Sequence, residues 1–333
     1  MNSPLNLPVK ESNQATDRSS GSLRPFHVAD PENPRQFWAV VIGIDEYPIA
    51  QDALYGCVCD ATNVFKYLTT NMGVPEDHVK LLLGPQPSNM CNILRPTRAT
   101  IINTLLALST DPQINKGDNI IIYYAGHGTV YHCRDHPAFA SGPYASDTIE
   151  ALCPMDRNTI EANNDNCKPI PDISDRELYT ILGEICRTKG HHITVILDCC
   201  HSASVTRVPE GSIQELRRRA RPLSGPTSIA DMLAVADKKL GEELKTDDGS
   251  PRYPSVSAAD WTVDVPAASH VVLAACRSYE YATESIIANP ADLKGALPTY
   301  RELVSGLPAN SCEQHPIVAG KYMNGPLWYM DPD

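Results

Sequence analysis

The chain has little positive charge for its length. Its 333 residues carry 28 lysines and arginines against 40 aspartates and glutamates, a formal net charge of −12. A nucleic-acid partner held by phosphate contacts needs clustered basic residues, so this balance argues against one. The sequence also has no run of about 18 apolar residues, which a membrane-spanning helix requires. We therefore expect no nucleic acid and no membrane as a partner.

The eleven cysteines include no C-x-x-C pair. A structural zinc site normally uses such a pair, so we expect no zinc. Disulfide scaffolds are typical of short secreted chains, and the N-terminal segment lacks the apolar core of a secretory signal. The sequence therefore predicts reduced thiols and a cytoplasmic location.

Two parts of the chain differ from the rest in composition. Residues 1–34 are rich in Pro, Ser and Asn without periodicity, which predicts a disordered tail. Residues 35–333 are expected to form one domain. Within it, residues 207–262 are dense in charge and punctuated by Gly and Pro, which predicts a surface linker insertion that is open to proteolysis.

Short apolar runs alternate with helical patterns after residue 36. Uninterrupted runs of this kind are typical of strands that are buried on both faces of a parallel sheet. The predicted strands are Phe37–Ile44, His78–Leu83, Asn119–Tyr124, Ile193–Leu197 and His270–Ala275. Apolar residues with helical spacing predict three helices: one from Leu54 towards Gly73, one after Thr97 and one after Ser174. Ser174 and Glu177 have the spacing of a capping box. The pattern indicates an α/β fold with helices on both faces of a mostly parallel sheet.

Chemically active residues follow two of the predicted strands. Gly126-His127-Gly128 comes after one strand, and Asp198-Cys199-Cys200 ends another. In open α/β sheets, functional sites lie beyond the carboxyl ends of the strands. Neighbouring strands are about 5 Å apart, so side chains from two strand ends can meet. A histidine that meets a cysteine there lowers the pKa of the thiol and supplies a thiolate nucleophile. The alternatives are a glycine-rich turn with an incidental histidine and cysteines that serve the core or a metal.

The same residues resemble a known family. Tyr-Tyr-Ala-Gly-His-Gly-Thr followed by Asp-Cys-Cys-His-Ser is similar to the metacaspases, caspase-fold cysteine peptidases, and to the fungal ones in particular. Further segments match in the same order and extend the resemblance over most of residues 36–330: Val40–Ile44, Leu54–Ala61, His270–Arg277, Thr299–Leu303 and Gln314–Pro316. The resemblance implies a three-layer caspase-like fold, an endopeptidase that acts through a thioester acyl-enzyme, and a role in apoptosis.

The resemblance also implies roles for single residues. Cys200 matches the nucleophile and His127 its acid–base partner, while the backbone N–H groups of Gly128 and Cys200 match the donors to the oxyanion. Cys199 is the rival nucleophile. Successive side chains of a strand point to opposite faces, so we expect Cys199 to be structural.

An acidic pocket is implied for the substrate. Asp60 and Asp198 match its lining, with Cys57 and Ala125 nearby. Two carboxylates in a partly dry pocket favour an Arg or Lys side chain, and Arg can be held bidentately. The expected partners are therefore proteins or peptides with Arg or Lys before the scissile bond. The alternative for Asp60 without the family is an exposed carboxylate on a helix.

Some residues depart from the family pattern. Ala203 stands where glycine is usual, Ala125 replaces a common serine, and a helix is missing between Gly295 and Tyr300. These departures keep a second hypothesis open, a caspase-fold pseudoenzyme that binds partners. A separase- or gingipain-like relative is a third possibility, but it lacks the segment around Asp60.

Calcium, self-cleavage and assembly complete the expectations. Asp156 and Asp175 match places in the acidic calcium site of metacaspases, yet Arg176 and Arg207 stand where further carboxylates belong. We expect no cofactor, with weak calcium dependence at most, and a monomer. The basic run 217–219 in the linker is a candidate self-cleavage site.

Overall fold

The computed structural model describes residues 35–86, 93–135, 148–160, 168–199, 218, 220–223, 228–258, 261, 269–275, 299–306 and 316–329. The predicted N-terminal tail lies outside these residues. A central sheet holds six described strands in the order β2-β1-β3-β7-β8-β9. Their bounds are β1 Phe37–Ile44, β2 Val79–Gly84, β3 Asn119–Ala125, β7 Ile193–Asp198, β8 Val271–Ala274 and β9 Ile317–Ala319. All neighbours pair in parallel except β8 and β9.

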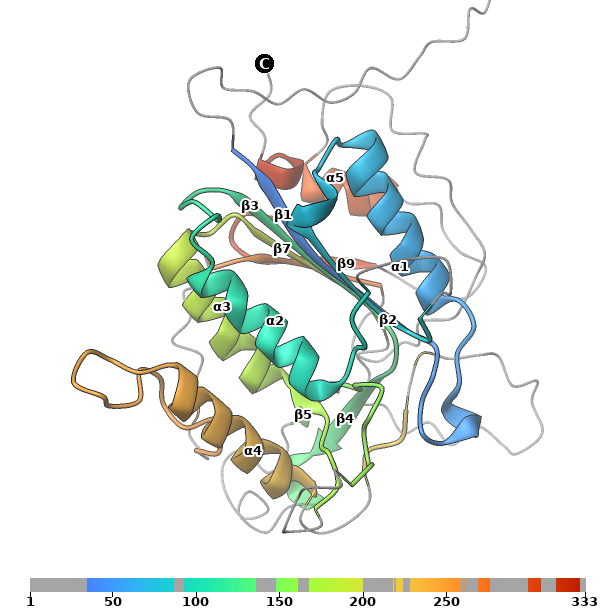
Figure 1. Cartoon of the computed structure of the whole chain (residues 1–333), viewed down its shortest axis with the longest axis vertical. Coiled ribbons are helices and arrows are strands. Elements are labelled where there is room, and N and C mark those ends of the chain that lie inside the picture. The colour runs from blue at the N-terminus through green and yellow to red at the C-terminus, as the bar shows by residue number, and fades with distance from the viewer. Residues whose placement is uncertain are drawn as a thin grey trace, which may run out of the picture.

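Helices cover both faces of this sheet. Figure 1 shows α2 (Arg98–Thr110) and α3 (Asp175–Lys189) on one face, and α1 (Cys57–Lys66) and α5 (Tyr300–Gly306) on the other. Every residue of β3 is buried as a result. The five predicted strands and three predicted helices are confirmed within one or a few residues, and so is the three-layer α/β fold.

The start of α1 is fixed at the carboxyl end of β1. Asp45 follows the strand, and its two carboxylate oxygens accept from the backbone N–H groups of Cys57 (2.8 Å) and Val58 (3.2 Å). Gly43 allows the close approach, because a Cβ atom there would lie 2.6 Å from the carbonyl oxygen of Cys57. The sequence thereby places the first turn of α1 beside the strand ends.

The predicted cap of α3 is present. The hydroxyl of Ser174 accepts from the N–H of Glu177 at 3.1 Å, as the capping-box spacing predicts. Glu177 also forms a buried ion pair of 2.5 Å with Arg98, which joins α3 to α2.

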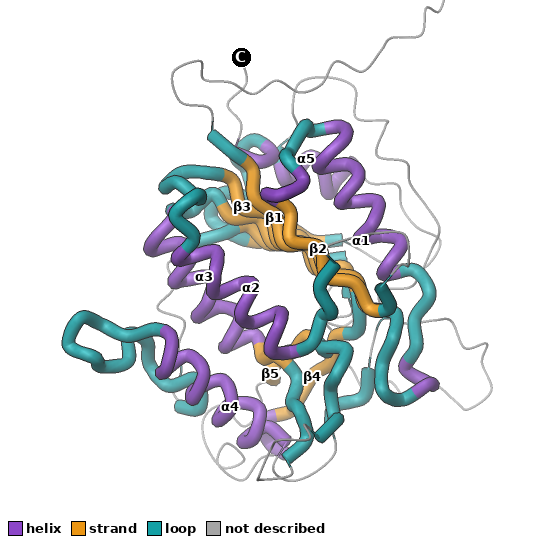
Figure 2. Tube along the Cα trace, viewed as in Figure 1, coloured by secondary structure: helices purple, strands orange, loops and turns teal. Residues whose placement is uncertain are grey.

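A smaller antiparallel sheet continues from the carboxyl end of β3. It has the described order β4-β5-β6, and Figure 2 shows β4 and β5 apart from the central sheet. The bounds are β4 Gly128–His132, β5 Thr148–Leu152 and β6 Ile173–Ser174. The sequence analysis did not predict these strands, because they are short and lack uninterrupted apolar runs.

Part of the predicted surface linker over residues 207–262 lies outside the described residues, and its middle part is helical. A 16-residue helix, α4 (Ser228–Glu243), lies there and packs beside α3. Its buried residues keep helical spacing: Ile229, Met232, Leu233, Ala236 and Leu240. The high charge of the exposed face concealed this apolar face. Among the described residues, no helix is long and apolar enough to cross a membrane.

Candidate active site

Three parallel neighbours bring the predicted residues to one edge of the sheet. The register pairs Gly43 of β1 with Ala125 of β3, and Ala125 with Asp198 of β7. His127 follows β3 by two residues, so it stands next to the end of β7. Cys200 and Ala203 lie outside the described residues, while Cys199 is completely buried at the end of β7.

The backbone of His127 is held on both sides. Its N–H donates to the hydroxyl of Tyr47 at 2.8 Å, and its carbonyl accepts from the hydroxyl of Tyr124 (2.7 Å) and the N–H of Cys153 (3.1 Å). Burial raises the pKa of both tyrosines well above the usual value, so both hydroxyls stay protonated. Gly126 leaves room for them, since a Cβ atom there would lie 2.8 Å from the Tyr124 hydroxyl.

The ring of His127 has a defined tautomer. Its Nε2 lies 2.7 Å from the carbonyl oxygen of Asp52. A carbonyl only accepts, so Nε2 carries the proton and Nδ1 keeps its lone pair. Nδ1 is buried and has no hydrogen-bond partner among the described residues. Burial lowers the pKa of His127, while the hydrogen bond to Asp52 opposes that shift in part. The site therefore contains a neutral imidazole whose Nδ1 can accept a proton.

Asp60 and Asp198 lie together and share one arginine. The Nη1 of Arg218 lies 2.6 Å from Asp198, and its Nη2 donates to Asp60. The Asp198 carboxylate also accepts from the hydroxyl of Tyr123 at 3.0 Å. The Arg218 side chain is 4% exposed, whereas the Asp60 and Asp198 side chains are 38% and 31% exposed. The buried guanidinium thus lies between two carboxylates that are each partly exposed to solvent.

The other predicted pocket residues are fully buried beside this pair. Cys57 begins α1, the helix that carries Asp60, and Ala125 ends β3 opposite Asp198. Asp60 is a partly exposed carboxylate on α1, as the alternative for this residue predicts, and it is also paired with a buried guanidinium.

The backbone around Arg218 also contacts the site. The N–H of Gly128, a predicted oxyanion donor, donates to the carbonyl oxygen of Arg218 at 3.1 Å. The carbonyl of Gly128 accepts from the N–H of Ala220 at 3.1 Å. An arginine of this chain therefore has its side chain between two carboxylates and its carbonyl at the N–H that follows the candidate histidine.

Sequence reasoning missed several residues of this arrangement. Tyr47 and Tyr124 hold the histidine, and their place next to strand ends was the available signal. Asp52 accepts from the ring of His127 through its backbone carbonyl. Every residue type has this group, so the sequence gives no signal for it. Arg218 belongs to the basic run that was singled out as a candidate cleavage site, but its contacts with Asp60 and Asp198 were not predicted.

The described residues do not fit the family's calcium site. Asp156 accepts from the backbone N–H of Arg98 at 2.8 Å and so caps α2. Asp175 is half-buried, and the desolvation of its carboxylate raises its pKa to about 7, which disfavours the charged form that calcium needs. No three acidic, histidine or cysteine side chains of the described residues form a metal-binding group. Arg207 lies outside the described part.

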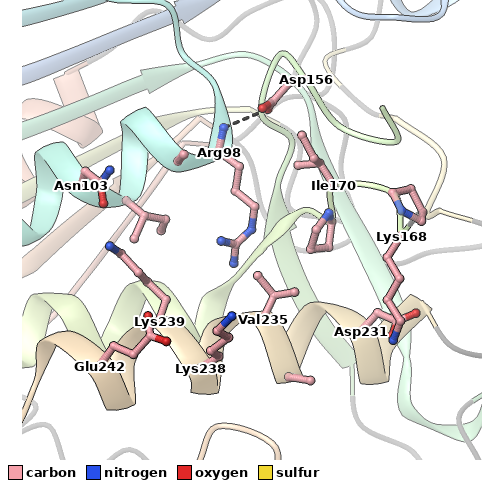
Figure 3. A pocket seen from close by; sticks show the side chains of 15 residues that line it. Arg98, Asn103, Asp156, Lys168, Ile170, Asp231, Val235, Lys238, Lys239 and Glu242 are labelled. Atoms are coloured by element: carbon pink, nitrogen blue, oxygen red, sulfur yellow. Dashed lines mark hydrogen bonds and ion pairs between the residues drawn. The ribbon is translucent and has the colours of Figure 1, made fainter. Parts of the chain in front are cut away.

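A cavity of about 550 Å³ lies elsewhere, between α2 and α4 (Figure 3). Its lining carries both signs of charge, and Lys168 pairs with Asp231 at 2.6 Å. None of the strand-end residues lines it. It is therefore separate from the candidate active site.

The fold has a counterpart among solved structures. The crystal structure of protein GSU0716 from Geobacter sulfurreducens matches with a TM-score of 0.53 at 17% sequence identity, and the match covers 89% of this chain and 99% of that one. At this identity the likeness concerns the fold alone, an α/β sheet with helices on both faces.

The sequence matches identify the family. The family model described as "Metacaspase, peptidase C14 domain" matches residues 38–209, just over half of the chain. The chain belongs to the metacaspase family of peptidase C14. It is 27% identical over 202 residues to Metacaspase-9 of Arabidopsis thaliana, a match that covers 61% of this chain and 52% of that protein.

Fungal relatives match over similar lengths. Metacaspase-1 of Saccharomyces cerevisiae is 27% identical over 194 residues, covering 58% of this chain and 39% of its own length. Metacaspase-1 of Candida glabrata is 30% identical over 200 residues, covering 57% of this chain and 45% of its own length. The chain thus matches about half or less of each of these relatives.

Proposed function

We propose that the chain is a cysteine endopeptidase that cuts proteins after Arg or Lys. Family membership supports the reaction class, and the contacts of Arg218 carry the specificity. Its guanidinium lies between Asp60 and Asp198, and its carbonyl accepts from the N–H of Gly128. An arginine before a scissile bond needs the same two contacts, one for its charge and one for its carbonyl oxygen.

The catalytic steps follow from the tautomer of His127. Its Nδ1 takes the proton from the thiol of Cys200, and the thiolate attacks the carbonyl carbon of the basic residue. The N–H groups of Gly128 and Cys200 stabilise the oxyanion. Collapse of the tetrahedral intermediate breaks the peptide bond and leaves a thioester on Cys200. The leaving amine takes the proton from His127. Water then hydrolyses the thioester with His127 as the base. The bond to Asp52 keeps Nδ1 available in both halves of the reaction.

The pseudoenzyme hypothesis predicts the same pocket without turnover. It rests on Ala125 and Ala203 and on the missing helix. The expected monomer, the cytoplasmic location and action without a cofactor stay predictions.

Hydrolysis of matched fluorogenic peptides that end in Arg, Lys or Asp tests the proposal. We expect turnover of the Arg and Lys peptides, none of the Asp peptide, and none by Cys200→Ala. Asp198→Asn and Asp60→Asn each remove one partner of the cation and should lower kcat/KM on the Arg peptide by about 100-fold. Glu76→Gln, an exposed carboxylate after α1, is the matched control. Equal turnover of Arg and Asp peptides would refute the specificity, and no Cys200-dependent turnover of any peptide would favour the pseudoenzyme.

A further inference from the structure

A second set of contacts holds the segment that follows the pocket arginine. The Nη2 of Arg157 donates to the carbonyl oxygen of Arg221 at 3.0 Å. The N–H of Leu223 donates to the hydroxyl of Tyr131 at 3.1 Å. Both contacts are made with the backbone of the segment, and the Arg221 side chain is exposed. The protein therefore holds this stretch through groups that almost any peptide has.

The binding side of these contacts is a buried, connected cluster. Arg157 donates to both oxygens of Asp172, at 2.8 and 2.7 Å, and the hydroxyl of Tyr131 donates to Asp172 at 2.7 Å. The three residues are at most 4% exposed. The Tyr131 hydroxyl donates its proton to Asp172, so its oxygen is left to accept a hydrogen bond from a backbone N–H. We call Arg157, Asp172 and Tyr131 the backbone clamp.

The order of contacts gives the direction of the bound segment. Gly128 bonds to the carbonyl of Arg218 on one side and to the N–H of Ala220 on the other, the pattern of a parallel strand pair. Tyr131 lies three residues further along β4 and binds Leu223. We number the residues after Arg218 from one. The clamp then binds the third, Arg221, by its carbonyl and the fifth, Leu223, by its N–H. The second, Ala220, is only 2% exposed.

We propose that the backbone clamp is a subsite for the part of a substrate that follows the scissile bond. This inference rests on the proposed cleavage after a basic residue. The site takes an extended peptide with a small side chain at the second position after the bond. It requires an N–H, and so excludes proline, at the fifth position. At the third position it binds the carbonyl and leaves the side chain in solvent.

Peptides of graded length test the subsite on the full 333-residue chain. The long substrate has the sequence of residues 214–224 with Gln in place of Arg217, Arg219 and Arg221, so that a single arginine remains. The short substrate ends after residue 219. We expect a kcat/KM about tenfold higher for the long peptide. An ester oxygen in place of the N–H at the Leu223 position should cost about threefold to tenfold, the value of one neutral hydrogen bond.

The variant Tyr131→Phe removes the acceptor for that N–H. In this variant the ester and amide peptides should have the same kcat/KM. The control Tyr67→Phe, at a tyrosine directly after α1, should show the same loss of kcat/KM with the ester as the wild type. If Tyr131→Phe fails to fold, the ester series on the wild-type chain still decides the question. Equal kcat/KM for the long and short peptides, or an ester cost that persists in Tyr131→Phe, overturns the clamp while cleavage after arginine stands. No cleavage of either peptide overturns the proposed function, and the subsite with it.

Discussion

The guanidinium of Arg218 lies 2.6 Å from the carboxylate of Asp198, the residue that ends β7. The buried arginine also pairs with a second carboxylate, Asp60, which belongs to α1. Burial opposes its charge, but the Asp198 and Asp60 carboxylates keep the pKa of Arg218 above its usual value. The chain thus places one of its own arginines between the two candidate substrate-binding carboxylates.

We predict that the active protein cuts itself after Arg218. A tethered segment that already lies in the site is present at high effective concentration. Mass spectrometry of protein aged at neutral pH should find fragments that correspond to residues 1–218 and 219–333. They should stay associated, because β8 pairs with β7 in the same sheet. Arg218→Gln should remove this cut and raise the initial rate on a short Arg peptide.

Lys238→Gln, a basic residue on α4, is the matched control and should be cut like the wild type. An intact chain in a preparation that hydrolyses Arg peptides would contradict self-cleavage. So would a cut that persists in Cys200→Ala protein free of contaminating protease.

The adjacent cysteines should respond differently to substitution. Cys200→Ala and His127→Ala should each abolish hydrolysis of Arg peptides. Cys199→Ala should keep most of it and cost about 1 kcal/mol in unfolding free energy, because Cys199 is completely buried. Peptide hydrolysis and urea unfolding measure the two effects. An inactive but folded Cys199→Ala together with an active Cys200→Ala would reverse the assignment.

His270 and Asp175 should give the unfolding free energy opposite dependences on pH. Burial lowers the pKa of His270 to about 4, so its native form stays neutral while the unfolded form gains a proton below about 6.5. Stability present above pH 6.5 is therefore lost as the pH falls towards 4, by about 3 kcal/mol. Asp175 lines a small cavity together with His270, Glu150 and Tyr179, and desolvation of its carboxylate raises its pKa to about 7. Its contribution is present at low pH and lost as the pH rises through 7.

Urea unfolding between pH 4 and 8 separates the two groups. The stability of the wild type relative to His270→Gln should fall as the pH is lowered from 7 to 4. The stability of the wild type relative to Asp175→Asn should fall as the pH is raised from 4 to 7. Parallel curves for the wild type and either variant would show that the corresponding group does not titrate in this way.

The buried ion pair between Arg98 and Glu177 should be costly to break from one side. Arg98→Met leaves a carboxylate that is completely buried, which should cost about 3–5 kcal/mol of unfolding free energy. The double variant Arg98→Met/Glu177→Met should recover most of that loss. The exposed pair Lys239–Glu243 on α4 is the control, and Lys239→Met should cost less than about 1 kcal/mol. Equal losses in the single and double Met variants would show that the charge is not the cause.

The sequence by itself determined five of the six described strands of the central sheet and the cap of α3. Apolar runs such as Phe37–Ile44 are local signals, and so is the hydroxyl of Ser174 three residues before Glu177. It also placed His127 and Asp198 at strand ends, because the carboxyl ends of parallel strands share one edge of a sheet. α4 was missed although its apolar spacing was present, since charged residues dominate that stretch.

Only the tertiary structure decided how the site is completed. Asp52 orients His127 through a backbone carbonyl, which any residue type could supply. Arg218 reaches Asp60 across 158 positions of the chain, and no local pattern encodes a contact at that separation. The backbone clamp joins Tyr131 to Asp172 in the same way. Local periodicity and capping can be read along a sequence, whereas partners that meet through folding are set by the packing of the whole domain.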